Sequence, residues 1–411
     1  MSITQDSNSG LKLMQQNNWR VGNLFGIPLF LDPSWFFVVI FITVINALDL
    51  QPRFGNISWV AGFVMALLLF GSVLLHELGH SLVALRQGIK VNSITLFLFG
   101  GVAAIDRESK TPLGAFGVAV AGPSVSLALF AIFAAIAQFL PTDTVLQLLA
   151  ADLSRINLVL AVFNMIPGLP LDGGQVLKAL VWQVTGDRFK AVRWAANCGK
   201  FIGGLGIAFG LSLLLITGQI GSIWLSLIGL FIYRNADSYS KVTSLQQAIQ
   251  QITAAETMTR DFRVVDAHLT LRSFAEEYVL SDVQKSLPYY ATADGRYRGL
   301  VPIDALQVIE RSEWDVQSLG DIVRPLTEIP TLPEKSSLVT VINSLEEKQL
   351  DFITILSPAE TVAGIIDRGD VVRAIATKLS LPISEADIKR IKTEGVYPQG
   401  FQLLALAKSI S

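Results

Sequence analysis

Residues 57–85, ISWVAGFVMALLLFGSVLLHELGHSLVAL, combine an apolar run long enough to cross a membrane with a short polar motif. The motif is His76-Glu77-Leu78-Gly79-His80, near the end of the run. On a helix, residues four apart lie on one face, so His76 and His80 can bind one metal ion while Glu77 acts on a water beside it. Because burying such groups in hydrocarbon is costly, the motif predicts a functional site.

The composition is typical of a membrane protein. The chain of 411 residues is 51% hydrophobic and 16% charged, with a mean hydropathy of +0.50. Its formal net charge of -2 gives no electrostatic reason to expect a nucleic-acid partner. A single cysteine, Cys198, excludes an internal disulfide framework and any multi-cysteine metal site. The polar N-terminal region lacks the pattern of a signal peptide, so we expect the N-terminus to be retained.

Six apolar runs are candidates for transmembrane helices. They cover residues 33–48, 57–85, 113–140, 153–181, 201–217 and 220–232. Residues 91–105 are also apolar but too short to span, and they include the pair Gly100-Gly101. We expect a membrane-associated β-hairpin there, with a partly buried loop as the alternative.

Basic residues flank alternate ends of these runs, which predicts the orientation of the chain. The basic residues expected on the cytoplasmic side are Lys12, Arg20, Arg86, Lys90, Arg107, Lys110, Arg188, Lys190, Arg193, Lys200, Arg234 and Lys241. The opposite loops offer Arg53 and Arg155. Both termini should therefore be cytoplasmic, an arrangement that suits the inner membrane of a bacterial cell.

After residue 240 the chain changes to an α/β pattern with frequent charges, and this region repeats itself. The stretch GLVPIDAL at residues 299–306 is echoed by GIIDRGDV at residues 364–371. Two stacked copies would each cover the apolar face of the other. We therefore divide the chain at residues 1–32 (an N-terminal cytoplasmic segment), 33–240 (the membrane domain), 250–312 and 322–379 (the two repeats), and 380–411 (a C-terminal tail).

The metal site needs a further ligand, because a catalytic zinc normally has three protein ligands and one water. The third histidine of the chain, His268, lies in the cytoplasmic repeat, so a carboxylate is expected. Asp172 follows Pro167 and Pro170 within a predicted span, where the helix should break. The orientation places Asp172 at a depth similar to His76 and His80. We predict that it is the third ligand; a helix cap at the kink is the alternative.

These residues resemble the site-2 protease family of intramembrane zinc metalloproteases. The pentad matches the HExxH motif of the family, and Asn164-x-x-Pro167 followed by Leu171-Asp172-Gly173 matches its second signature. Residues 122–126, GPSVS, resemble the small-residue motif between them. The resemblance implies that His76, His80 and Asp172 bind Zn²⁺, that Glu77 is the general base, and that Asn164 stabilises the tetrahedral intermediate. It also implies that the hairpin lies beside the active site and could hold an unwound substrate by strand addition.

The repeats resemble a tandem pair of CBS domains, a cytoplasmic module that in many proteins senses adenine nucleotides. Its Gly-x-x-Thr-x-x-Asp motif is matched by Gly364 and Asp370, but Asp367 replaces the hydroxyl residue. The first repeat has Pro302 and Ala305 at the last two positions. The resemblance therefore implies at most one ribose contact, from Asp370. A structural or dimerising role for the pair is the alternative.

The sequence thus predicts a multi-domain chain, with a polytopic α-helical membrane domain and a cytoplasmic tandem CBS pair. We expect an intramembrane zinc endopeptidase that cuts transmembrane segments of membrane-anchored proteins, as in regulated intramembrane proteolysis. Adenine nucleotide or homodimerisation would regulate it through the CBS pair. The alternatives are a CBS-regulated transporter or channel, which would not need HELGH, and an inactive protease-like scaffold.

Overall fold

The computed structural model describes residues 18–98, 100–280, 287–397 and 403–410. Lys12 and residues 1–17 of the predicted N-terminal segment lie outside the described residues. The chain divides into two compact units, with the boundary between Thr243 and Ser244. We refer to them as unit 1 and unit 2.

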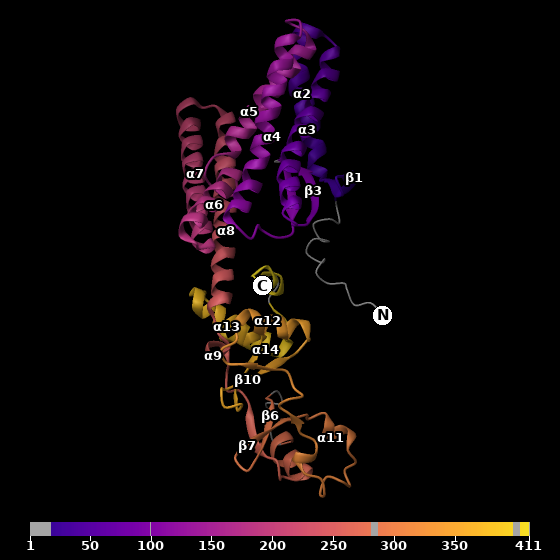
Figure 1. Cartoon of the computed structure of the whole chain (residues 1–411), viewed down its shortest axis with the longest axis vertical. Coiled ribbons are helices and arrows are strands. Elements are labelled where there is room, and N and C mark those ends of the chain that lie inside the picture. Colours follow the sequence, from indigo (N-terminus) through magenta and orange to yellow (C-terminus); the bar gives the residue numbers. More distant parts are fainter. Residues whose placement is uncertain (1–17, 99, 281–286, 398–402, 411) are drawn as a thin grey trace. The chain divides into compact units, whose positions relative to one another are not determined.

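Unit 1 consists of long helices and one small sheet (Figure 1). Its strands are β1 (Trp19–Leu24), β2 (Ile27–Leu31), β3 (Val91–Phe97) and β4 (Gly100–Ile105). Its helices are α2 (Pro33–Phe54), α3 (Ile57–Arg86), α4 (Pro112–Phe139), α5 (Val145–Asn164), α6 (Asp172–Thr185), α7 (Arg188–Thr217), a short 3-10 turn η1 (Ile220–Ser222) and α8 (Ile223–Gln251), which continues past the boundary.

The helix starts follow from local sequence signals. Asp32 and Thr111 cap α2 and α4 by accepting hydrogen bonds from the backbone N–H of Ser34 and Gly114. In both cases a proline follows the cap, at the first helical position where its missing N–H costs nothing. Asp187 caps α7 in the same way, through the N–H of Lys190.

Five helices of the described chain are long and apolar enough to cross a membrane: α2, α3, α4, α5 and α7. The expected sixth span, residues 220–232, covers η1 and only the apolar start of α8. The fourth expected span, residues 153–181, is split: α5 ends at Asn164 and α6 begins at Asp172. The predicted break is therefore present, and it separates one spanning helix from a short helix of 14 residues.

The predicted hairpin at residues 91–105 is present as β3 and β4, and it is part of a larger sheet. The strand order is β1-β2-β3-β4, with β2 parallel to β3 and the other pairs antiparallel. Residues assigned from the sequence to an N-terminal segment thus extend the hairpin. Ile27 of β2 and Ile94 of β3 are buried against Leu78 of α3, which fixes the sheet to the helix that carries the polar pentad.

Unit 2 contains the two repeats, each built as a parallel strand pair followed by an antiparallel hairpin. The first has β5 (Arg263–Asp266), α10 (Leu271–Phe274), η2 (Ala275–Val279), β6 (Tyr289–Ala293), β7 (Arg296–Val301), α11 (Ala305–Val308), η3 (Leu319–Asp321) and β8 (Arg324–Pro325). The second has β9 (Thr331–Pro333), α12 (Leu338–Glu347), β10 (Phe352–Leu356), β11 (Val362–Asp367) and α13 (Arg368–Leu379). The sheets have the orders β5-β6-β7-β8 and β11-β10-β9.

The repeats interlock more closely than the sequence boundaries suggest. The helix α9 (Ala254–Thr257), assigned to the first repeat, contributes Ala254 to the core of the second. Conversely, β8 lies within the residues assigned to the second repeat but pairs with β7 of the first. Between the repeats, Tyr290 and Thr354 form a buried hydroxyl–hydroxyl hydrogen bond of 2.6 Å.

The C-terminal tail also belongs to the core of unit 2. It forms α14 (Glu385–Glu394) and α15 (Leu403–Ile410). Ile388 and Ile391 of α14 are buried with Val372 of α13, and Leu403 and Ala407 of α15 join the core of the second repeat. No role for the tail is predicted from the sequence, whereas the structure makes it a packed part of this unit.

Candidate metal centre

His76, His80 and Asp172 meet at one point inside unit 1. The two histidines lie one turn apart on α3, and Asp172 is the first residue of α6. The Nε2 atom of His76 is 3.0 Å from Asp172 Oδ2, the Nε2 atom of His80 is 3.3 Å from Asp172 Oδ1, and the two Nε2 atoms are 3.3 Å apart. Both imidazoles are buried. The structure thus brings together the three residues that the sequence singled out as metal ligands.

The geometry of this triad fits a zinc ion. Zinc–ligand bonds of about 2.0–2.1 Å at tetrahedral angles place neighbouring ligand atoms about 3.3 Å apart. The separations above match that spacing, with Asp172 facing the two imidazoles through different oxygens, and one donor atom from each residue lies within 4.8 Å of the others. Two imidazoles and one carboxylate are also the donor set of catalytic zinc sites, which leave a fourth position for water.

Two groups of helix α4 contact the Nδ1 atoms of the two imidazoles, while the Nε2 atoms face Asp172. The Nδ1 atom of His76 is 2.9 Å from the hydroxyl of Ser126, and the Nδ1 atom of His80 is 2.7 Å from the carbonyl oxygen of Val118. A carbonyl can only accept, so His80 donates from Nδ1 and keeps a lone pair on Nε2 for a metal. Such partners fix ring orientation and raise ligand basicity.

Gly122 lets α4 approach this closely. A Cβ atom added there would collide with His80 Nε2 and would lie 2.7 Å from His76 Nε2. The α4 backbone at this position therefore lies directly against the metal-binding edge of both rings. Gly122 and Ser126 were noticed in the sequence only as part of a small-residue motif; their contacts with the histidines depend on a helix pairing that the sequence does not specify.

Glu77 lies between the histidines in sequence and faces the sheet. A Cβ atom added at Gly101 of β4 would be 2.6 Å from Glu77 Cγ. The hairpin therefore packs directly on the side chain predicted to be the general base. Because β4 is an edge strand of the sheet, one of its sides has no strand partner within the described residues.

The helix break that presents Asp172 is buried at Gly168 and Leu169 and exposed at Met165 and Pro167. The backbone N–H of Leu169 donates to the carbonyl of Ala195 on α7, at 3.2 Å. A Cβ atom at Gly168 would lie 2.7 Å from the Cα of Gly199, so small residues on both sides let the break and α7 touch. Irregular backbone at membrane depth is tolerated where it is buried in this way. Asn164, the last residue of α5, is half-buried at the start of the break.

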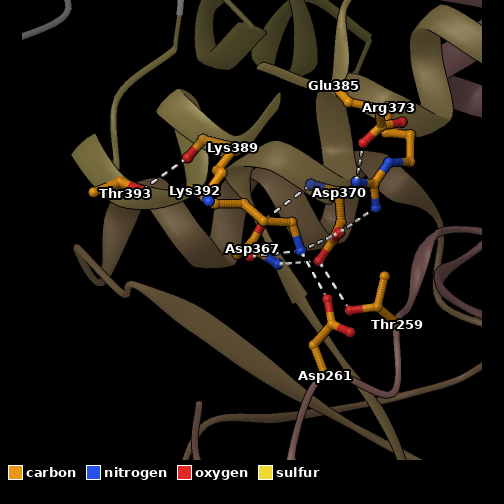
Figure 2. Close-up of polar contacts among 9 residues, drawn as sticks. All are labelled: Thr259, Asp261, Asp367, Asp370, Arg373, Glu385, Lys389, Lys392 and Thr393. Carbon is orange, nitrogen blue, oxygen red and sulfur yellow. Dashed lines mark hydrogen bonds and ion pairs between the residues drawn. The ribbon is translucent and has the colours of Figure 1, made fainter. Parts of the chain in front are cut away.

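The second predicted binding residue, Asp370, lies in unit 2 and is fully occupied by protein groups (Figure 2). Its carboxylate accepts hydrogen bonds from the backbone N–H of Asp367 at 3.2 Å and from Thr259 Oγ1 at 3.3 Å. It also forms ion pairs with Lys392 at 2.7 Å and Arg373 at 3.4 Å. Burial and the neighbouring Asp367 raise the pKa of Asp370 more than Lys392 lowers it.

The fold and the triad define a class: a polytopic membrane protein with a metalloprotease-type zinc site. Residues 64–156 and 144–205 match the family described as "Peptidase family M50". A putative zinc metalloprotease of Synechocystis sp. is 38% identical over 365 residues, which are 88% of this chain and 96% of the relative. The chain therefore belongs to the M50, or site-2 protease, family of zinc metalloproteases.

The site-2 protease from Methanocaldococcus jannaschii is similar over 54% of this chain and 95% of its own, with 32% identity and a TM-score of 0.39. The CBS domain of a bacterial CNNM/CorC family Mg²⁺ transporter matches over 38% of this chain and 96% of its own, with 15% identity and a TM-score of 0.29. Family membership decides for a membrane-integral zinc metalloprotease over the transporter or channel that the sequence left open.

Proposed function

We propose that His76, His80 and Asp172 hold one zinc ion and that Glu77 is the general base of an intramembrane endopeptidase. The convergence of the two Nε2 atoms and the Asp172 carboxylate, with contacts of 3.0–3.3 Å between them, is the observation that carries this proposal. Glu77 adjoins His76 on the same helix, and its side chain is held against β4. A base in this position can serve a water molecule at the centre of the triad.

In the reaction, zinc would supply a Lewis acid that activates water and polarises the scissile carbonyl. The residues of the chain do the rest. A Glu77 Oε atom takes a proton from the attacking water and then delivers it to the leaving nitrogen. The side-chain amide of Asn164 would donate to the carbonyl oxygen as negative charge develops there. Ser126 and Val118 keep both imidazoles in the orientation that binding requires.

The substrate would be a transmembrane segment of another membrane protein. An intact helix hides its carbonyls in hydrogen bonds, so the segment must unwind before cleavage. The outer edge of β4 offers backbone groups for strand addition, and Gly101 places that strand against Glu77. A substrate strand held there would present its carbonyl beside the base.

We further propose an arrangement in which both termini are cytoplasmic and α8 forms the sixth crossing. The flanking basic residues support this orientation, and a bacterial inner membrane would suit it. Water would reach the site from the cytoplasm along the break between α5 and α6. Unit 2 would gate this route, either by binding an adenine nucleotide or by forming a dimer. Its direct continuation from α8 motivates this regulatory role.

Reconstitution tests the enzymatic part. Wild type and Glu77→Gln would be placed in liposomes with defined transmembrane substrates, and the fragments identified by mass spectrometry. We expect wild type alone to cut, within or next to the transmembrane segment. Cleavage confined to soluble regions of the substrates would contradict an intramembrane endopeptidase. Deleting the residues after Lys241 tests gating: an unchanged rate and nucleotide response in a folded protein would rule it out.

A further inference from the structure

The tail helix α14 docks on the beginning of α13, where the acidic groups of the second repeat gather. Ile388 and Ile391 of α14 are buried against Val372 of α13. At the end of the same interface, Arg373 of α13 pairs with Glu385 at 3.2 Å. The contact is thus fixed by apolar burial and by charge, and it holds α14 over one defined patch of the repeat.

A glycine permits this close approach. Gly369 lies in the first turn of α13, and a Cβ atom added there would be 2.5 Å from Lys392 Cγ and 3.2 Å from the carbonyl oxygen of Ile388. A larger residue would force the Lys392 side chain to shift and would crowd the α14 backbone at Ile388. Its helical position carries no positive φ, so close packing is the feature that calls for glycine here.

Lys392 reaches from α14 into a ring of three carboxylates (Figure 2). Its Nζ atom is 2.7 Å from Asp370 Oδ1 and 3.2 Å from both Asp367 Oδ2 and Asp261 Oδ2. These acids come from two separate segments of the chain, one before β5 and one at the start of α13. Burial lowers the pKa of Lys392, but Asp370 and Asp367 outweigh it and raise the pKa overall, so the ammonium stays charged.

The contacts of Asp370 leave no acceptor position for another partner. A carboxylate offers about four lone-pair sites. Oδ1 faces Lys392 and Arg373, and Oδ2 faces Thr259 and the N–H of Asp367. The side chain is 0% exposed. A ligand hydroxyl can therefore bind Asp370 only if one of these groups leaves, and Lys392 is the one carried by a separate surface helix.

A cavity of about 250 Å³ is lined in part by Asp370. Its wall includes Asp370 and Arg373 from α13 together with Lys378 further along the same helix and Glu256 from α9. Two cations for phosphate oxygens and one buried carboxylate for ribose hydroxyls form a suitable set for a nucleotide. While α14 is docked, the Asp370 carboxylate is paired with Lys392 and is not available to a ligand.

We propose that Lys392 is an internal ligand of this site, so that a nucleoside or nucleotide reaches Asp370 only after α14 has moved away. This inference rests on the nucleotide-binding part of the proposed function. Ligand binding and tail docking would then exclude each other. Undocking of α14 would therefore accompany binding of the nucleotide. The apparent affinity for the nucleotide would be lowered in proportion to the fraction of molecules in which α14 is docked.

The test separates steric release from charge. Adenosine and ATP would be titrated by calorimetry into four full-length proteins in detergent: wild type, Gly369→Ala, Lys392→Gln and Lys389→Gln. Gly369→Ala crowds the Lys392 side chain and the Ile388 carbonyl of α14 without changing any charge, whereas Lys392→Gln removes the internal ligand. Lys389 is an exposed lysine of the same helix that meets Thr393 through its backbone carbonyl, which makes it the matched control. Because adenosine is uncharged, its affinity is insensitive to the lost lysine charge.

Hydrogen exchange of residues 385–394 in wild type, with and without ATP, reports release of α14.

We expect adenosine to bind Gly369→Ala and Lys392→Gln about tenfold more tightly than wild type and Lys389→Gln, in line with removal of a docked state. We also expect saturating ATP to speed exchange of α14 in wild type. Equal affinities in all four proteins, with α14 exchange unchanged, would overturn the inference and leave nucleotide binding intact. Failure of both ligands to bind any of the four would overturn the inference and the nucleotide part of the proposed function together.

Discussion

Asp172 and Asp370 are both carboxylates at the start of a helix, yet their surroundings are opposite. Asp172 faces two imidazole nitrogens whose rings are oriented from behind by Ser126 and Val118. Asp370 faces an ammonium supplied by the chain itself. At the first site, the carboxylate and the two imidazoles surround a position where a bound cation would balance the negative charge of Asp172. At the second site, the negative charge of Asp370 is already balanced by cationic side chains of the protein. The difference indicates that one site is built to hold a metal and the other to be covered.

The largest effect should come from removing the carboxylate charge at each site in turn. Asp172→Asn takes away an anionic ligand, so we expect zinc content to fall from about one per chain to near zero and cleavage to be lost. Asp370→Asn should leave the zinc content unchanged, because Asp370 is not one of the three predicted metal ligands. Metal analysis by mass spectrometry, together with the cleavage assay, checks both. Equal zinc loss in the two variants would remove the distinction drawn between the sites.

A smaller effect is expected from the groups that orient the ligands. Ser126→Ala removes the partner of His76 Nδ1, and losses of this kind typically weaken metal binding about 10- to 100-fold. Ser124→Ala is the matched control on the same helix, since the Ser124 hydroxyl bonds to the carbonyl of Val120 instead. Competition with a chelator would measure the zinc affinity of each. If both variants retained wild-type affinity, Ser126 would have no role in holding His76.

The smallest effect concerns an ion cluster that connects the hairpin exit with α6 and α7. Glu108 pairs with the buried Lys178 at 3.1 Å and with Arg188 at 3.0 Å. Burial alone would raise the pKa of Glu108, but these two cations lower it below its ordinary value. A carboxyl group with a lowered pKa stabilises the fold above its unfolded pKa of about 4.3, and this contribution is lost as the pH falls through the folded pKa.

Glu108→Gln should therefore destabilise the protein at pH 7 and flatten its loss of stability on acidification. We expect the free energy of unfolding at pH 7 to fall by about 1–2 kcal/mol. This loss is smaller than for a fully buried ion pair, because the Glu108 side chain is 43% exposed and its charge is screened by water. Thermal unfolding in detergent between pH 7 and 4 measures this. Lys178→Met combined with Glu108→Gln should recover part of the loss; an unchanged pH profile in Glu108→Gln would contradict the assignment.

The sequence singled out the three candidate metal ligands because each carried an independent signal. His76 and His80 had helical spacing in an apolar run, and Asp172 followed prolines that break a helix. Gly122, Ser126 and Val118 could not be assigned roles, because their contacts depend on how α4 packs against α3. The strands β1 and β2 were missed because they depend on pairing: β1 pairs with β2, and β2 pairs with β3, which lies much further along the chain. Lys392 gave no signal at all, because its partners lie far away in the sequence.

The central claim is that Glu77 transfers protons at the zinc site without being a zinc ligand. The most direct measurement determines zinc content and cleavage rate on the same preparations of wild type and Glu77→Gln. We predict that Glu77→Gln keeps about one zinc per chain and loses cleavage of the transmembrane substrate. Cleavage at the wild-type rate by Glu77→Gln would contradict this account.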